Sequence, residues 1–331
     1  MPADPAQTHV AVTYDHTAPL VACRFDPAGR YVFAGAQDNK VLRWDLASGA
    51  KVELAAHDSW VFSFAFSKDA ATLITAGYDG RLIWWATAAD QPVPVRTIDA
   101  HRGWIRAVVT SPDGQFLATC GDDLLVKLWR LEDGTLVREF PGHLRYVFNV
   151  AFHPDGKHLV SSDLVARFIQ WELETGKLVR EFPIAALTKY DEGFRADYGG
   201  AHDMSFSLDG KRLLASGITN VTNAFAGVGN PIVVEIDWET GKEAITHLTK
   251  AKLNGVAWGS LYHPDGFIAA AIGGQAGGHL FFWKPDAADE FHSLSLGSPA
   301  RDLSLHPDGL RLATPHHDSK LRISLMGPKQ S

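Results

Sequence analysis

A short turn recurs seven times along the chain and constrains its fold more than any other feature. The seven copies read DPAG (26–29), SKDA (67–70), SPDG (111–114), HPDG (153–156), SLDG (207–210), HPDG (263–266) and HPDG (306–309). Proline presets φ at the second position, aspartate bonds back to the backbone, and glycine accepts a positive φ. Each turn lies between two short runs with strand character, so each one marks a hairpin.

The repeat has a regular period. Successive turns end 41 to 56 residues apart, and most intervals are 41 to 44. A tryptophan follows five of the turns at a distance of 15 to 17 residues, at Trp44, Trp85, Trp129, Trp171 and Trp283. A period in the low forties with four short strands per unit is typical of a β-propeller, and seven turns predict seven blades.

Three units carry a further pattern, in which a histidine precedes the tryptophan: His57…Trp85, His101…Trp129 and His143…Trp171. With these markers the chain resembles the Trp-Asp (WD) repeat family, although the strict dipeptide occurs only at Trp44-Asp45. The resemblance covers residues 8–326. It implies an all-β, seven-bladed β-propeller of four-stranded antiparallel blades.

The blades follow from the repeat. A single domain over residues 1–331 is predicted, with blades at 17–55, 58–99, 102–140, 144–182, 195–248, 252–296 and 299–326. The last unit lacks its outer strand, and residues 8–14 are expected to supply it, because a closed propeller leaves no large open edge. Blade five carries two insertions near 184–199 and 219–230, which we expect on the top face. They hold Tyr190, Phe194, Arg195, Tyr198 and Phe225.

Composition excludes several classes of protein. The formal net charge of −7 gives no basic footprint for nucleic acid. No apolar stretch is long enough to span a membrane, and the N-terminus lacks the pattern of a secretory signal. Cys23 and Cys120 fall in different blades and do not indicate a disulfide scaffold. We therefore expect a cytoplasmic protein that needs no cofactor and no metal ion.

Histidine, hydroxyl and aspartate side chains at fixed spacing look like a catalytic triad. The family resemblance implies instead a structural hydrogen-bond network in blades two and three. Its members are His57, Thr75, Asp79 and Trp85, and His101, Thr119, Asp123 and Trp129.

The network is expected to be incomplete elsewhere. Ala34 replaces the hydroxyl in blade one, and Val165 replaces the aspartate in blade four. Blade seven keeps Thr314 and Asp318, and blades five and six keep essentially none of the network. Because each lost buried hydrogen bond costs about 1 kcal/mol, blades five to seven are expected to open more easily.

In the family, partners contact the top rim at the start of each inner strand and just before the aspartate of the loop between the second and third strands. The partner-binding residues predicted there are Trp60, Phe62, Tyr78, Trp104, Arg106, Tyr146, Phe148, Trp258, His202 and Arg301. Aromatic side chains with an arginine are typical of binding hot spots, although any single ring can instead pack between blades. A hydrophobic or proline-rich segment, a basic peptide bound by cation–π contact, or a single Arg or Lys side chain would suit such a surface.

We therefore predict a non-catalytic scaffold that binds a protein or peptide. One alternative is an enzyme or metal site at the top of the channel, built from His202, Asp203, Arg301 and Asp302. Another is an architectural subunit of a larger complex. The His316-His317-Asp318 sequence is a weak metal pattern without further spaced ligands. His153, His263 and His306 open bottom turns, where capping is their expected role.

Overall fold

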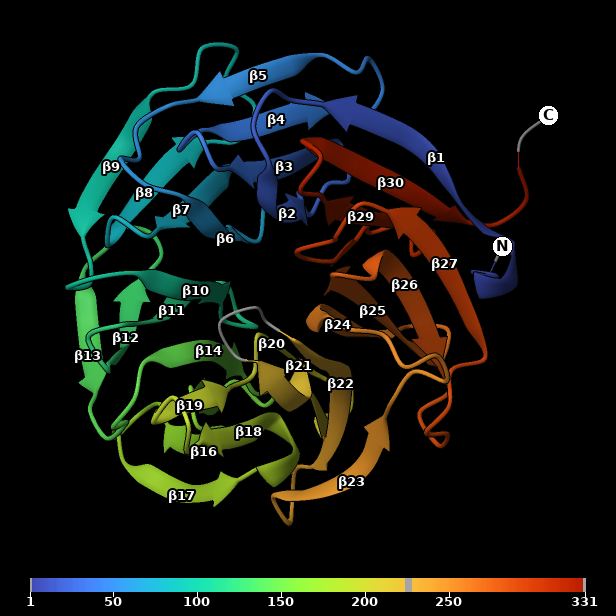
Figure 1. Ribbon diagram of the computed structural model, residues 1–331. Helices are drawn as coiled ribbons and strands as arrows, with labels where there is room; N and C mark the ends of the chain where they lie inside the picture. Colours follow the sequence, from blue (N-terminus) through green and yellow to red (C-terminus); the bar gives the residue numbers. More distant parts are fainter. Residues whose placement is uncertain (1, 224–227, 330–331) are drawn as a thin grey trace. The chain divides into compact units, whose positions relative to one another are not determined.

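The chain folds into antiparallel sheets throughout. The computed structural model describes residues 2–223 and 228–329, so Phe225 lies outside the described residues. Seven of the sheets have four strands each, and one further sheet is a two-stranded hairpin (Figure 1). The predicted all-β, seven-bladed β-propeller is confirmed.

The chain forms two compact units. The first comprises Met1–Pro141 and Arg301–Ser331 and holds blades one, two, three and seven. Blade one contains β2 (Leu20–Phe25), β3 (Tyr31–Ala36), β4 (Val41–Asp45) and β5 (Lys51–Leu54). Blade two contains β6 (Val61–Phe66), β7 (Thr72–Gly77), β8 (Arg81–Ala86) and β9 (Pro94–Asp99). Blade three contains β10 (Ile105–Thr110), β11 (Phe116–Gly121), β12 (Val126–Arg130) and β13 (Leu136–Phe140).

Blade seven combines the two ends of the chain. Its strands are β28 (Ser304–Leu305), β29 (Arg311–Pro315), β30 (Lys320–Met326) and β1 (Thr8–Asp15). β1 pairs antiparallel with β30, with Thr8 opposite Met326, and Figure 1 shows the blue strand beside the red one. A short 3₁₀ helix, η1 (Pro5–Gln7), precedes β1 and is capped by the side chain of Asp4. The prediction that the N-terminal segment completes the last blade is confirmed.

The second unit, Gly142–Ala300, holds blades four, five and six. Blade four contains β14 (Val147–Phe152), β15 (His158–Asp163), β16 (Arg167–Glu172) and β17 (Leu178–Pro183). Blade five contains β20 (Asp203–Phe206), β21 (Arg212–Asn223), β22 (Val228–Asp237) and β23 (Lys242–His247). Blade six contains β24 (Val256–His263), β25 (Phe267–Gly274), β26 (Gly277–Trp283) and β27 (His292–Gly297).

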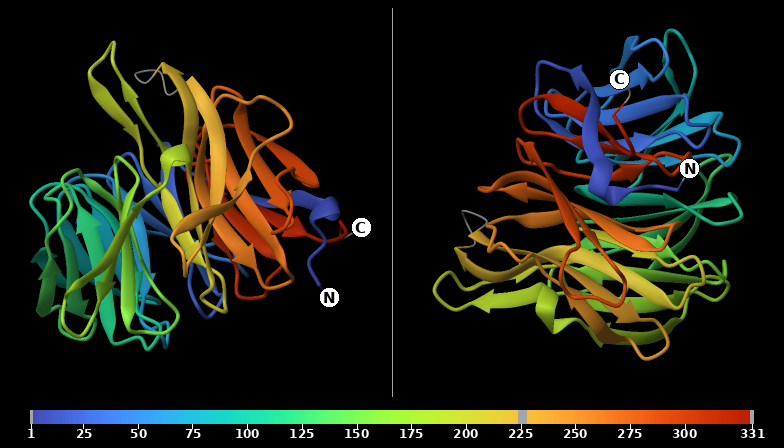
Figure 2. Two further views of the ribbon diagram at one scale, coloured as in Figure 1. Left: turned by 90° about the horizontal axis from the view of Figure 1, so that it is seen from below. Right: turned by 90° about the vertical axis from the view of Figure 1, so that its right-hand side faces the viewer.

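The two insertions belong to this second unit. The first forms the 3₁₀ helix η2 (Ala185–Leu187) and a hairpin of β18 (Thr188–Asp191) and β19 (Ala196–Gly199). In the left view of Figure 2 this yellow-green hairpin extends beyond the ends of neighbouring strands of its unit. The second insertion lengthens β21 and β22, the longest strand pair of the described residues.

Burial follows the position of each strand in its blade. The second strand of a blade is covered on both faces, as in β3, where every residue is buried. In β27 the outer strand alternates between exposed and covered positions. Trp44, Trp85, Trp171 and Trp283 are at most 2% exposed, so these repeat markers are core residues. Both cysteines are buried free thiols, and burial raises the pKa of each.

Candidate functional site

A β-bulge shapes the rim of five blades. The register between the first and second strand shifts by one residue at Val21, Phe62, Arg106, Phe148 and Trp258. A bulged residue has no partner in the ladder, and bulges often re-aim a side chain beside a functional site. Four of these five, Phe62, Arg106, Phe148 and Trp258, are rim residues predicted from the sequence. The rim residue therefore has a backbone environment different from that of its neighbours in the strand, because the register of the pairing shifts at it.

Four aromatic side chains form a continuous stack in the first unit. The ring centroids of Phe62 and Tyr78 lie 4.3 Å apart with planes 9° from parallel. Those of Tyr78 and Trp104 lie 4.0 Å apart at 3°, and Trp60 contacts Phe62 at 6.2 Å. Trp104 is 43% exposed and ends the stack, while the other three rings are partly buried. We call these four rings the aromatic stack.

Two arginines flank the aromatic stack. The guanidinium of Arg106 lies 5.2 Å from the Trp104 ring, and its Nε donates to the Asp122 carboxylate at 2.7 Å. Arg301 lies close enough to Tyr78 for their charges to interact, and burial lowers the pKa of Arg301. Burial likewise raises the pKa of Tyr78 to about 12, so its phenol stays neutral at physiological pH.

Three predicted rim residues of the second unit form a cluster. His202 lies between Trp258 and Phe148, with centroid distances of 4.6 Å and 5.7 Å. Tyr146 is 48% exposed at the end of the loop that precedes β14. In the same loop, Arg145 Nε donates to Asp197 in β19 at 2.9 Å, which ties the inserted hairpin to the rim of blade four.

The carboxylates of the predicted channel site have structural partners. Asp302 accepts from the backbone N–H of Cys23 at 2.8 Å in the first unit. Asp203 accepts from the backbone N–H of Ser260 at 2.9 Å in the second unit. Each carboxylate thus bonds the inner strand of the next blade. Asp203 and His202 belong to one compact unit, and Asp302 and Arg301 to the other.

Blade two contains a hydrogen-bonded chain of four buried side chains. Trp85 Nε1 donates to Thr75 Oγ1 at 3.0 Å, and this hydroxyl lies 2.7 Å from His57 Nε2. His57 Nδ1 lies 2.9 Å from Asp79 Oδ2. All partners are satisfied if the threonine donates to a neutral histidine and the histidine donates to the aspartate. The Thr75 hydroxyl is fully buried and already engaged, so it has no access to a substrate.

Blade three repeats this chain with His101, Thr119, Asp123 and Trp129. The His101 ring lies 2.8 Å from Asp123 and 2.7 Å from Thr119, to which Trp129 donates at 2.9 Å. Burial lowers the pKa of His101, and this effect outweighs the opposite effect of Asp123. The lowered pKa favours the neutral imidazole that the hydrogen-bonded chain requires.

The expectation for blade four was wrong, because its network is complete. Trp171 donates to Ser161 Oγ at 2.8 Å, and Ser161 lies 2.7 Å from His143 Nε2. Asp163, not a residue at position 165, takes the carboxylate role at 2.9 Å from His143 Nδ1. Asp163 occupies the last position of β15, two residues before the position where blades two and three carry their aspartate.

The geometry of the glycines explains this substitution. Gly77 and Gly121 end the corresponding strands of blades two and three. A Cβ on Gly77 would lie 2.5 Å from His57 Nδ1, and one on Gly121 would lie 3.2 Å from His101 Nδ1. A side chain at this position therefore points directly at the histidine ring. In blade four the residue at this position is Asp163, and its carboxylate bonds the histidine ring.

The remaining blades have reduced networks. In blade one His16 Nε2 bonds Asp38 at 3.0 Å, and Ala34 leaves the hydroxyl position apolar as expected. In blade seven the buried His316 lies 2.8 Å from Thr314 Oγ1, while Asp318 pairs with Arg322. These two contacts engage His316 and Asp318, two members of the predicted weak metal pattern, in local hydrogen bonds.

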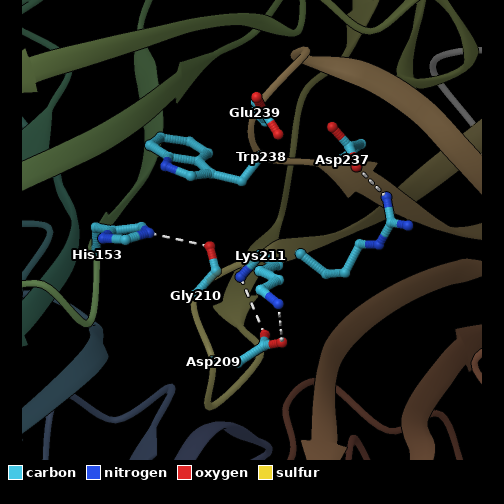
Figure 3. A pocket seen from close by; sticks show the side chains of 8 residues that line it. His153, Asp209, Gly210, Lys211, Asp237, Trp238 and Glu239 are labelled. Atoms are coloured by element: carbon cyan, nitrogen blue, oxygen red, sulfur yellow. Dashed lines mark hydrogen bonds and ion pairs between the residues drawn. The ribbon is translucent and has the colours of Figure 1, made fainter.

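The bottom turns use their histidines as predicted. His153, His263 and His306 each accept, through Nδ1, the backbone N–H two residues further on, at 3.0 to 3.1 Å. Beside His153 lies a pocket of about 520 Å³ whose wall includes Trp238, Asp209, Lys211 and Arg212 (Figure 3). Arg212 pairs with Asp237, and Lys211 lies 4.0 Å from Asp209, so these cations carry counter-charges of their own.

Comparison with known proteins places this geometry in a family. The family model described as WD domain, G-beta repeat matches residues 7–45, 50–86, 92–130 and 134–167. The matched units are blades of the propeller, and the remaining blades repeat the same four-stranded order. The chain is a seven-bladed β-propeller, and it belongs to the WD40 repeat family.

Part of the chain is also similar to longer curated proteins. It is 34% identical over 142 residues to "Protein HIR1" of Mycosarcoma maydis, covering 37% of this chain and 14% of that protein. It is 27% identical over 136 residues to "Protein HIR1" of Eremothecium gossypii, covering 36% and 16%. "Protein hir1" of Schizosaccharomyces pombe is 25% identical over 146 residues, covering 38% and 16%. The match thus spans about one sixth or less of these relatives. Among the residues that the structure describes, no helix is long and apolar enough to cross a membrane.

Proposed function

We propose that this protein is a non-catalytic scaffold that binds a peptide segment of a protein partner on the aromatic stack. The aromatic stack is the observation that carries the proposal. Its rings are already held parallel at 4.0 and 4.3 Å, so they need little ordering when a ligand arrives. Aromatic side chains presented in this way are typical of binding hot spots. A cytoplasmic location stays a prediction.

The charges around the aromatic stack favour one class of ligand. Arg106 already lies over the face of Trp104, and Arg301 adds positive charge near Tyr78. A lysine or arginine of a basic peptide would meet the like charges of Arg106 and Arg301 there. An apolar or proline-rich segment has no such repulsion and can pack against the rings. We therefore favour a hydrophobic or proline-rich peptide over a basic one.

The hydrogen bonds of the carboxylates argue against the enzymatic alternative. Asp203 and Asp302 each accept a backbone N–H from a neighbouring inner strand, which is a structural task. The hydroxyls of the His–Thr pairs are buried, and each is already held by a tryptophan N–H.

A selection from a displayed peptide library, followed by calorimetric titration of the enriched peptides, tests the proposal. The variant is Trp104→Ala, and the matched control is Phe291→Ala, which removes a ring of similar exposure, 45% against 43%, from another part of the surface. Enriched peptides should be apolar or proline-rich and should bind Trp104→Ala at least about tenfold more weakly. Equal affinity for wild type and Trp104→Ala would contradict the proposal that the aromatic stack is the binding surface. Enrichment of lysine- or arginine-rich peptides would instead support the cation–π alternative.

A further inference from the structure

The most exposed ring of the aromatic stack lies between two arginines of its own chain segment. The segment reads RGWIR, so Arg102 precedes Trp104 by two residues and Arg106 follows it by two. At the same positions around its rim tryptophan, blade two carries Asp58 and Phe62. The two ends of the aromatic stack therefore differ in charge, and positive charge gathers at the end that belongs to blade three.

Arg102 presents its charge to solvent from a fixed backbone. It is exposed, and among residues 2–223 and 228–329 its guanidinium makes no hydrogen bond, ion pair or ring contact. Its backbone N–H donates to Asp123 at 3.2 Å, and the backbone N–H of Asp122 donates to the carbonyl of Trp104 at 3.0 Å. These bonds hold the segment at both ends, with the two Cα atoms of Arg102 and Trp104 at most about 7 Å apart. The donors of Arg102 are therefore open to a ligand that covers the Trp104 ring.

Further charges lie beside Tyr78, the next ring of the aromatic stack. Arg106, Asp122 and Arg301 all lie close enough to Tyr78 for their charges to affect its pKa. Together these three groups carry one net positive charge, and the phenol adds none because burial raises its pKa to about 12. Arg301 is partly buried, where salt screens a charge less than it does in open solvent.

The neighbouring carboxylates of blades two and three already have cationic partners. Asp58 pairs with Arg81, which also lies 2.9 Å from Asp79. Asp123 is buried and lies 3.6 Å from Lys127. Their negative charge is offset locally, so the charge that a ligand meets at the blade-three end of the aromatic stack is positive.

We propose that the peptide bound by the aromatic stack carries an acidic side chain beside its apolar or proline residues, and that Arg102, Arg106 and Arg301 bind this carboxylate. The inference rests on the proposed function and narrows the partner to an acidic–apolar segment. A guanidinium offers its donors in a planar fork that matches a carboxylate. On a protein of net charge −7, this local positive charge directs the acidic end of the peptide to blade three and so sets its direction on the stack.

Selection from a displayed random peptide library, followed by calorimetric titration, tests the charge of the ligand. Enriched peptides that lose affinity for Trp104→Ala should carry aspartate or glutamate close to an apolar or proline residue. Each such peptide is synthesised again with asparagine or glutamine in place of the acid. Wild type should bind the acidic form at least about fivefold more tightly than the amide form, and this ratio should fall as salt is raised from about 50 to about 500 mM.

A charge reversal locates the contact. In Arg102→Glu the affinity ratio of the acidic to the amide form should fall at least about threefold, because an attraction becomes a repulsion. The matched control is Arg30→Glu, which reverses an arginine with a 64% exposed side chain beside the bottom turn of blade one and should leave the ratio unchanged. Circular dichroism and the melting temperature verify that both variants fold, and Arg102→Gln takes the place of Arg102→Glu if that variant does not.

The outcomes distinguish this inference from the proposed function. Equal affinity for the acidic and amide forms, or an unchanged ratio in Arg102→Glu, would overturn the acidic partner. Enrichment of neutral apolar peptides that still need Trp104 would also overturn it, and the proposed function would stand. Enrichment of basic peptides would reverse the inferred charge and overturn it as well. If the enriched peptides bind Trp104→Ala as tightly as wild type, the proposed function and this inference both fail.

Discussion

Replacing Asp163 by alanine should destabilise the protein strongly, because three donors lose one buried acceptor. The carboxylate accepts from His143 Nδ1 at 2.9 Å and from the backbone N–H groups of Val165 and Arg167 at 3.1 Å each. Asp163 is fully buried, so water cannot replace it. At about 1 to 1.5 kcal/mol for each unsatisfied donor, the loss is about 3 to 4.5 kcal/mol. In a unit of this size that corresponds to a fall in the melting temperature of at least about 6 °C, measured by circular dichroism.

Two further variants separate the parts of this effect. Asp38→Ala in blade one removes an acceptor whose side chain is 28% exposed and which bonds His16 at 3.0 Å, so it should cost only about 1 kcal/mol. Asp163→Asn keeps an oxygen for the two backbone donors and loses only the bond to His143, so its melting temperature should lie between wild type and Asp163→Ala. Equal melting temperatures for Asp163→Ala and Asp38→Ala would refute the argument that the shifted carboxylate completes the network.

Three other outcomes follow from the same networks. Gly77→Ala should destabilise by about 1 to 3 kcal/mol, because its Cβ would lie 2.5 Å from both Asp79 Oδ1 and His57 Nδ1, whereas Gly327→Ala, with open space around it, should be neutral in the same thermal melt. Burial raises the pKa of Asp79, but hydrogen bonds led by that to His57 outweigh it and lower the pKa to about 2. The resulting stability of about 2 kcal/mol is present above pH 4 and lost as the pH falls toward 2, and acid titration of Asp79→Asn should show a flatter profile over that range. Amide exchange should be slower in blades two, three and four than in blade six, and the reverse order would count against the stabilising role of the networks.

The fold can be predicted from the sequence because the repeated turn residues are those that the backbone dihedral angles of each turn require. Each bottom turn requires residues that accept its dihedral angles, as Gly29, Gly114 and Gly156 do with φ of +66° to +78°. These requirements recur in every blade and therefore appear as a period. The N-terminal strand was also predictable, since an incomplete last unit needs an outer strand that the start of the chain can provide.

The blade-four network could not be predicted in the same way. The aspartate of blade four was expected at position 165, the position that blades two and three use. Asp163 instead lies at the position that corresponds to Gly77 and Gly121. An aspartate in place of the strand-ending glycine was the available signal.

The contrast between networks and rim explains where specificity can reside in this repeat. Buried chains such as Trp85–Thr75–His57–Asp79 tolerate few replacements, because every donor needs its acceptor. The bulged rim residue has no ladder partner, so its side chain can change without disturbing the sheet. The five bulged positions accordingly hold Val21, Phe62, Arg106, Phe148 and Trp258. Variation at positions that the fold leaves open is what allows one scaffold to present a surface particular to this chain, and the aromatic stack is built from one such position and its neighbours.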